Sequence, residues 1–411
     1  MSASTYPLFQ CFGIELEYMI VDKDSLQVKP LADELLKYEL GVIGSDFENG
    51  IVTWSNELVM HVIEIKSTKP ELDLETLEKE FEKNIARING ILSKWNAMLL
   101  PSAAHPLMNP FSDTKLWPHD NNEVYSLYDK IFNSKGHGWS NLQSTHLNLP
   151  FQGDEEFAKL HAACRLILPL LPALCASSPL LDGKLSGMLD TRLHYYKTNQ
   201  ANIPIITGRI IPENIYSHDE YKNQVYLPIA EAIAPHDPET ILDPIWVNSR
   251  GAMARFDRGS VEIRVMDIQE CAAADMAIVN TVIEILKLFV DEKLISLTEQ
   301  KKMDTEVLAT IFNQAAVTGF ATQVNDLSYL GTFGIKSTVS IKEIWSELLE
   351  KIPTTTPYQK ANREIINTII SHGSLSERII QALGADVSEP GIKKVYYQLS
   401  TCLKENKLFI P

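Results

Sequence analysis

The chain has 411 residues, of which 45% are hydrophobic and 22% charged, an ordinary composition for a protein that buries a full core. Lys and Arg number 37 against 53 Asp and Glu, so the formal net charge is −16. A surface of that sign repels phosphate backbones, and no basic run interleaved with aromatic residues occurs, which argues against a nucleic-acid partner. The charge does not exclude a nucleotide held through metal ions and a few local arginines.

The five cysteines are odd in number and widely spaced, and no C-x-x-C motif occurs. Neither a disulfide framework nor a zinc site is therefore indicated. Residues 1–10 lack the basic and apolar regions of a secretory signal. Residues 166–181 are uncharged and mostly apolar, but they are too short to span a bilayer and contain three prolines, so we expect a buried helix end. These features predict a cytoplasmic protein with no membrane partner.

The first strand is predicted at residues 13–18, Gly-Ile-Glu-Leu-Glu-Tyr. Side chains alternate across a strand, so Glu15 and Glu17 share one face, roughly 7 Å apart. Two like charges on one face repel each other, which costs stability unless a cation offsets it. The pair therefore suggests a site for divalent cations. The alternative is a solvated face of an antiparallel sheet.

A second strand is predicted at residues 58–66, with Glu64 near its end. Glu57 comes just before this strand and has the opposite parity. If both carboxylates serve one site, Glu57 must lie in the entering loop or beyond a bulge.

A third strand is predicted at residues 144–150, where Ser144, His146 and Asn148 share one face. A single histidine on a strand is more often structural than functional. Here it belongs to another strand with a polar face, which favours a metal or phosphate ligand.

The fourth strand with a polar face is predicted at residues 260–267, with Glu262, Arg264 and Met266 on one side. An acid and a base two residues apart suit a site that binds both a cation and an anion. The alternative is a cross-strand salt bridge through Arg264. The loop before this strand contributes three more arginines, which are Arg250, Arg255 and Arg258.

Helices are predicted at residues 71–99, 154–177 and 272–297, and the first of these has the most regular apolar stripe. We expect it to cover the back of the sheet. Residues 181–243 are the least regular part and contain Arg192. The last hundred residues are mostly helical. The chain is thus an α+β protein with a core at residues 1–300 and a helical region at residues 301–411 packed on it.

Four strands contribute acidic and imidazole side chains to one polar face, and this set is Glu15, Glu17, Glu64, His146 and Glu262, with Glu57 at its margin. Carboxylates and one imidazole, without thiolates, select hard ions such as Mg²⁺ or Mn²⁺. Metal ions beside arginines are what phosphoryl transfer from ATP needs, since that chemistry is mainly positioning and charge neutralisation. Neither a P-loop nor a dinucleotide-binding glycine motif occurs.

Five segments in order resemble the successive blocks of the glutamate–cysteine ligase superfamily, and most closely its second bacterial branch, the carboxylate–amine ligases. These are Gly-Ile-Glu-Leu-Glu-Tyr at 13–18, Asn-Glu-Leu-Val-Met-His-Val-Ile-Glu at 56–64, Ala-His-Pro at 104–106, Thr-His-Leu-Asn at 145–148 and Val-Glu-Ile-Arg-Val-Met-Asp at 261–267. The resemblance implies a glutamine-synthetase-like fold, an antiparallel sheet curved around ATP and up to three Mg²⁺ ions with helices on its outer face.

The resemblance also implies roles for single residues. Arg264 matches a substrate- or phosphate-binding arginine, and Arg192 matches an arginine near the transferred phosphate. Arg255 and Asn148 are assigned to the nucleotide, with Arg250 and Arg258 as open alternatives to Arg255. The metal ligands it implies are Glu15, Glu17, Glu57, Glu64, His146 and Glu262.

The resulting expectation is an ATP-dependent ligase that forms an amide from a small carboxylate and an amine through an acyl phosphate. Glutamate is the expected acid and cysteine the default amine, by family name only. One alternative is a phosphotransferase of guanidino-kinase type on the same scaffold, and another is a non-catalytic nucleotide- or metal-binding protein. A metal-assisted hydrolase is less favoured because no second histidine lies at ligand spacing. The sequence leaves the substrate pair open, and a homo-oligomer is compatible with it.

Overall fold

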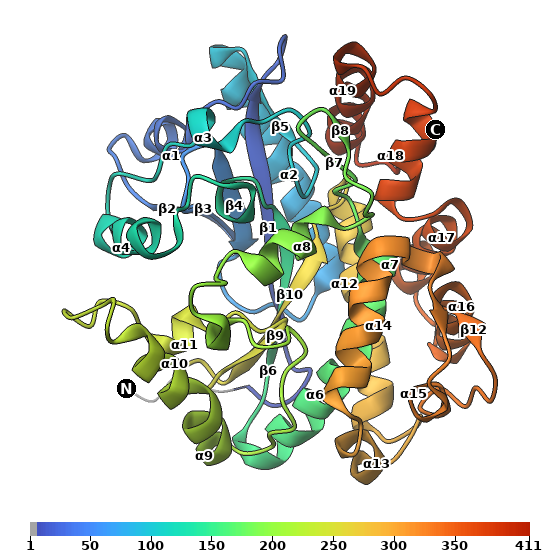
Figure 1. Ribbon diagram of the computed structural model, residues 1–411. Helices are drawn as coiled ribbons and strands as arrows, with labels where there is room; N and C mark the ends of the chain where they lie inside the picture. The colour runs from blue at the N-terminus through green and yellow to red at the C-terminus, as the bar shows by residue number, and fades with distance from the viewer. Residues whose placement is uncertain (1–5) are drawn as a thin grey trace.

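The computed structural model describes residues 6–411 and has an eight-stranded antiparallel sheet at its centre (Figure 1). The strand order is β2-β3-β4-β1-β6-β10-β9, and β5 also pairs with β1. The strands are β1 Gly13–Asp22, β2 Asp46–Asn49, β3 Val52–Asn56, β4 Val62–Ser67, β5 Ala97–Leu100, β6 Ser144–Pro150, β9 Ala252–Arg255 and β10 Ser260–Asp267. Strands distant in sequence are thus neighbours in the sheet.

The strand β1 separates an apolar face of the sheet from a polar one. Ile14, Leu16, Tyr18 and Ile20 are fully buried in the main core, whereas Glu15 and the other odd-numbered residues face the opposite side. The apolar face packs against α2 Leu74–Leu92, α6 Gly153–Ile167 and α12 Ala272–Val290, whose buried residues belong to the same core. This arrangement confirms the predicted α+β class with helices on the outer face.

The helix α6 continues through a 3-10 turn into α7 Leu171–Cys175. The whole segment, Gly153–Cys175, is long and apolar enough to cross a membrane by composition, but 94% of its most apolar window is buried inside the protein. Pro169 and Pro172 lie where the regular helix is interrupted, because proline removes a backbone donor. The predicted buried helix end is confirmed.

The C-terminal part is mostly helical, as predicted, and lies along one side of the sheet (orange to red in Figure 1). Its α17 shares the main core with α12. The face that carries Glu15 becomes apolar further along β1, where Met19 and Val21 form a second core cluster with Leu375 of α18 and Tyr396 of α19. The helices are α13 Leu297–Lys301, α14 Thr305–Thr318, α15 Leu327–Gly331, α16 Ile341–Lys351, α17 Pro357–His372, α18 Leu375–Leu383 and α19 Glu389–Glu405. A domain division near residue 300 stays a prediction.

Short elements connect these layers. The helices among them are α1 Ala32–Leu40, α3 Pro110–Asp113, α4 Asn122–Phe132, α5 His137–Ser140, α8 Thr191–Thr198, α9 His218–Tyr221, α10 Leu227–Ile233 and α11 Pro244–Val247. Two small hairpins are β7 Leu180–Leu181 with β8 Lys184–Leu185, and β11 Gln323–Val324 with β12 Val339–Ser340. The region 181–243 is therefore more helical than its composition indicates.

The strand predicted at residues 58–66 begins four residues late, at Val62. Residues 58–60 instead pair with the segment 115–117, where Met60 N donates to Lys115 O and Trp117 N donates to Leu58 O, both at 2.9 Å. An apolar run does not show which segment it will pair with, so the predicted start of this strand is wrong.

A bulge in β10 corrects a second prediction. The register of β10 against β6 shifts between Ile263 and Met266. Because one extra residue reverses the alternation, Met266 lies in the main core rather than beside Arg264. The same shift places Asp267 opposite Ser144, on the polar face.

A buried amide, Asn84 of α2, ties the helix to the edge of the sheet. Its Oδ1 accepts hydrogen bonds from Trp54 Nε1 at 2.7 Å and Asn49 Nδ2 at 2.9 Å. We expect Asn84→Leu to lower the free energy of unfolding by about 1–3 kcal/mol, since it leaves the buried indole N–H without a partner. Urea unfolding measures this. Asn367→Leu on the exposed face of α17 is the control, and equal stability of both variants would contradict the assignment.

Candidate active site

The register of the sheet brings the predicted acidic residues together. Glu15 lies directly opposite His146, and Glu17 lies opposite Glu64 on the other neighbouring strand. Glu262 of β10 is opposite Asn148, two residues along β6 from the histidine. Three neighbouring strand pairs thus stack these side chains on one face of the sheet.

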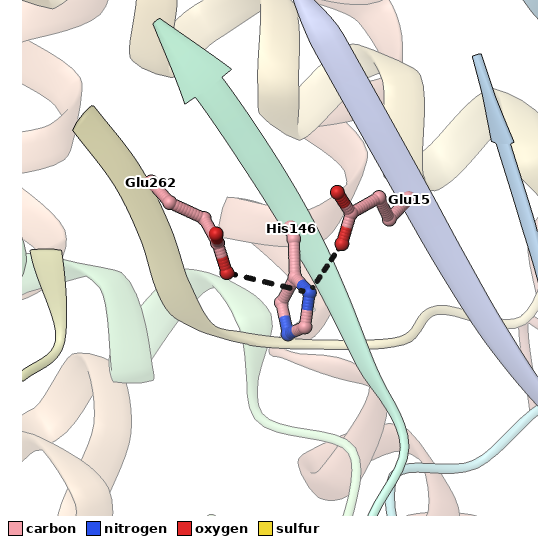
Figure 2. Close-up of side chains that lie close together, drawn as sticks. All are labelled: Glu15, His146 and Glu262. Carbon is pink, nitrogen blue, oxygen red and sulfur yellow. Dashed lines mark hydrogen bonds and ion pairs between the residues drawn. The ribbon is translucent and has the colours of Figure 1, made fainter. Parts of the chain in front are cut away.

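Figure 2 shows Glu15, His146 and Glu262 pointing toward one another from three adjacent strands. His146 Nδ1 lies 2.9 Å from Glu15 Oε2 and 3.9 Å from Glu262 Oε1. One ligand atom from each residue lies within 4.8 Å of the other two. An ion about 2.0–2.5 Å from each atom fits this spacing, and oxygen with imidazole donors fits Mg²⁺ or Mn²⁺.

Glu17 accepts two hydrogen bonds and also lies near the imidazole of His146, whose Nε2 is 3.9 Å from Glu17 Oε1. The backbone N–H and the hydroxyl of Ser144 both donate to Glu17 Oε2, at 2.7 and 2.9 Å. The same hydroxyl lies 2.9 Å from His146 Nε2. Ser144 therefore orients two of the predicted ligands together.

Glu57 and Glu64 approach the group from the other side. Glu57 follows β3 in the loop before β4, one of the two positions expected for it. Burial and the charge of Glu64 raise the pKa of Glu57 well above its ordinary value. Burial and the charge of Glu15 raise the pKa of Glu64 to about 7, although Lys66 Nζ lies 2.6 Å from its carboxylate. The repulsion between like charges is therefore strongest at Glu57 and Glu64.

The pKa of Glu15 shifts in the opposite direction to that of Glu57 and Glu64. Burial by itself raises the pKa of Glu15, but the hydrogen bond and charge of His146 lower it, to about 2. For His146, burial lowers the pKa, but the hydrogen bond to Glu15 raises it above its ordinary value. A charged pair therefore forms at the centre of the acidic face.

A cleft of about 370 Å³ lies over this face. It is lined by all six predicted metal ligands and by Arg264, Arg192 and Arg255. Asn148 is not among the lining residues, and its amide donates to Glu15 Oε1 at 3.0 Å. In this structure Asn148 orients a carboxylate.

Arg264 and Arg255 both approach Glu262. Arg264 Nε lies 2.9 Å from Glu262 Oε1, and Arg255 Nη1 lies 3.7 Å from Glu262 Oε2. Of the three arginines left open by the sequence, Arg255 and Arg258 line the cleft. Arg250 instead forms a two-point contact with Glu213 at 2.6 and 2.7 Å, with its side chain fully buried.

Arg192 lines the cleft, and most of its guanidinium donates to other groups of the protein. Its Nε is 2.5 Å from Asp267 Oδ1, and its Nη2 donates to the carbonyls of Arg264 and Met266 at 3.1 and 2.8 Å. Only Nη1 of the guanidinium is outside these contacts. Arg192 thus fixes the bulged end of β10 that carries Arg264.

Several residues of the site were not found from the sequence. The strand pattern does indicate Lys66, because it lies two residues after Glu64 and therefore on the same face of the strand. Asp267 had none, since only the bulge brings it to this face. Aromatic residues also line the cleft, and Tyr128 contacts Trp139 and Trp246 at ring-centroid distances of 5.1 and 5.0 Å. These aromatic residues come from three segments with no regular pattern.

Comparison with known protein chains gives two relatives. An uncharacterized protein of Archaeoglobus fulgidus is 32% identical over 402 residues, which cover 97% of this chain and all of that protein. A Ruegeria pomeroyi protein named "Putative glutamate--cysteine ligase 2" is 24% identical over 259 residues, which cover 62% of this chain and 60% of that protein.

Two solved structures share the fold. One is the glutamate–cysteine ligase of Francisella tularensis in complex with AMP, with a TM-score of 0.62 at 13% identity. The match covers 98% of this chain and 90% of that chain. The other is a bifunctional glutathione synthetase of Pasteurella multocida, with a TM-score of 0.59 at 14% identity. The match covers 95% of this chain and 53% of that chain. At such identities the likeness is one of fold.

The sequence profile of a single family, described as glutamate–cysteine ligase family 2, matches residues 11–398. That span contains every strand of the central sheet and every residue that lines the cleft. The chain therefore belongs to glutamate–cysteine ligase family 2.

Proposed function

We propose that this protein is an ATP-dependent ligase that joins a small carboxylate to an amine through an acyl phosphate. The observation that carries the proposal is the cleft that six metal-type ligands line together with four arginines. The family match supports the ligase class, and the fold shared with a ligase crystallised with AMP supports the use of ATP.

The residues fit divalent metal ions. Glu15, His146 and Glu262 would hold one ion, and Glu17, Glu57 and Glu64 offer further carboxylates to others. Bound Mg²⁺ or Mn²⁺ would neutralise the phosphates of ATP. So many carboxylates in one cleft favour more than one cation, because like charges there cannot all stay ionised unaided.

The chain's own residues would position the reacting groups. Arg264 lies beside Glu262 with about a quarter of its side chain exposed, so its guanidinium can reach an anion in the cleft. Arg255 and Arg258, at the same end, are suited to phosphate. Arg192 donates to the backbone of β10 at Arg264 and Met266, and its Nη1 would make a supporting contact with the transferred group.

The reaction then needs an acid that accepts the γ-phosphate and an amine that displaces it. Glutamate is the first acid to test, and cysteine the first amine, as the family name indicates. The cytoplasmic location and a homo-oligomer stay predictions.

The charge of Glu262 gives the first functional prediction. Glu262→Gln keeps the shape of the side chain but removes the charge that would hold a cation and two arginines. We expect at least about a hundredfold loss of ATP turnover, about 2.7 kcal/mol. Mg²⁺ should also raise the melting temperature of the wild type more than that of the variant.

The matched control is Glu82→Gln on the exposed side of α2, which should keep both the turnover and the Mg²⁺ effect. Wild-type turnover in Glu262→Gln would mean that this carboxylate is only a salt-bridge partner.

Hydroxylamine distinguishes a ligase from a kinase. An acyl phosphate reacts with hydroxylamine to give a hydroxamate, whereas a phosphoguanidine gives none. We expect a hydroxamate with ATP, Mg²⁺ and one acid from a panel of amino acids that starts with glutamate. Arg264→Lys should lose most of this activity, since lysine cannot reproduce a planar two-point contact.

A stable N-phosphorylated product without a hydroxamate would favour the guanidino-kinase alternative. ATP that is not consumed with any acid would favour a binding protein. Arg209→Lys, at an exposed ion pair with Glu306, is the control for the arginine substitution.

A further inference from the structure

His146 offers two ring nitrogens to the acidic face, and they lie in different surroundings. Nδ1 lies between two carboxylates, 2.9 Å from Glu15 Oε2 and 3.9 Å from Glu262 Oε1 (Figure 2). Nε2 lies 2.9 Å from the hydroxyl of Ser144 and 3.9 Å from Glu17 Oε1. A neutral imidazole has one nitrogen that donates a proton and one that carries a lone pair. Since both nitrogens have a glutamate nearby, distance alone does not identify the one that binds a metal ion.

The hydroxyl of Ser144 decides between the two nitrogens because it has a single proton. It donates that proton to Glu17 Oε2 at 2.9 Å, since an ionised carboxylate can only accept. The same oxygen accepts the backbone N–H of Ser144 at 2.7 Å, which agrees with its role as an acceptor. The hydroxyl oxygen can then only accept from His146, so Nε2 must carry a proton and donate it. Nδ1 is therefore the nitrogen that can present a lone pair.

The sheet fixes the position of Ser144. The pairing between β1 and β6 ends at Leu16 and Thr145, so the backbone N–H of Ser144 lies just past the last pair and donates to the Glu17 carboxylate instead. On its other side Ser144 is opposite Asp267, after the bulge in β10. The residue is only 6% exposed, so bulk water has little access to replace these contacts.

We propose that Ser144 is a positioning residue that makes Nδ1 of His146 the metal-binding nitrogen. The inference rests on the metal site of the proposed function and adds which atoms bind there. Nδ1 would bind the ion held with Glu15 and Glu262, while Nε2 keeps its proton on the Ser144 hydroxyl. A proton that Nδ1 shares with Glu15 before the ion binds passes to water. Because Ser144 takes Oε2 of Glu17, Oε1 is the oxygen that Glu17 offers to a second ion.

The first test measures Mn²⁺ binding to the protein by calorimetry, without ATP or any acid. Ser144→Ala removes the hydroxyl that orients the ring, and outer partners of metal-binding histidines are typically worth about 10–100-fold in metal affinity. We expect the Kd for Mn²⁺ to rise about tenfold in Ser144→Ala, and Ser144→Thr to restore most of the affinity because it keeps the hydroxyl. The control is Ser102→Ala, which removes a buried hydroxyl that does not line the cleft and should leave the Kd unchanged.

The second test identifies the nitrogen with two substitutions of His146. The amide oxygen of asparagine is bonded to Cγ, as Nδ1 is in histidine, so His146→Asn places a ligand atom near the position of Nδ1. The amide oxygen of glutamine is one bond further out, near the position of Nε2. We expect both variants to bind Mn²⁺ more weakly than the wild type, and His146→Asn to bind it about tenfold more tightly than His146→Gln.

The inference is overturned if His146→Gln binds Mn²⁺ as tightly as His146→Asn, or if Ser144→Ala keeps the wild-type Kd. A cooperative melting transition without metal shows that each variant is folded, and if Ser144→Ala is not, the two His146 variants decide alone. A wild type that binds no Mn²⁺ overturns the inference together with the metal site. A wild type that binds Mn²⁺ but forms no hydroxamate would mean only that the proposed ligase reaction is wrong.

Discussion

The repulsion among carboxylates on one face of the sheet is the constraint on which the rest of the site depends. Five glutamates line one cleft, and the nearest positive charges are Lys66, Arg264 and the imidazole of His146. These partners leave the carboxylates with unequal pKa values, low for Glu15 and raised for Glu64. Such a face is costly to fold unless cations bind there, which is the physical basis for the proposed metal site.

The bulge in β10 solves a geometric problem within this arrangement. A regular strand would place Met266 on the polar face and turn Asp267 toward the helices. With the bulge, Asp267 Oδ1 lies 2.5 Å from Arg192 Nε, and Arg192 in turn donates to the carbonyls of Arg264 and Met266. The position of Arg264 therefore depends on a buried ion pair behind it. Bulges are common near active sites for this reason.

Much of this could be predicted from the sequence because strand alternation is a local signal. The strands β6 and β10 begin and end as predicted, and His146 of β6 and Glu262 of β10 lie on one face. The local pattern could not show which ladder Leu58 would join, because partner choice depends on distant residues. It also could not show the bulge or the aromatic residues that line the cleft. Those features arise where segments far apart in the sequence meet.

The helical C-terminal part belongs to the same structural argument. It covers the apolar end of the strand face that carries Glu15, through contacts with Met19 and Val21. Arg378 of α18 forms a fully buried ion pair with Glu270, which also accepts a hydrogen bond from Phe409 N. Breaking one partner of such a pair is strongly destabilising, because a buried charge is left uncompensated. Since Glu270 follows β10 by three residues, the end of the chain is linked through that strand to Glu262 and Arg264.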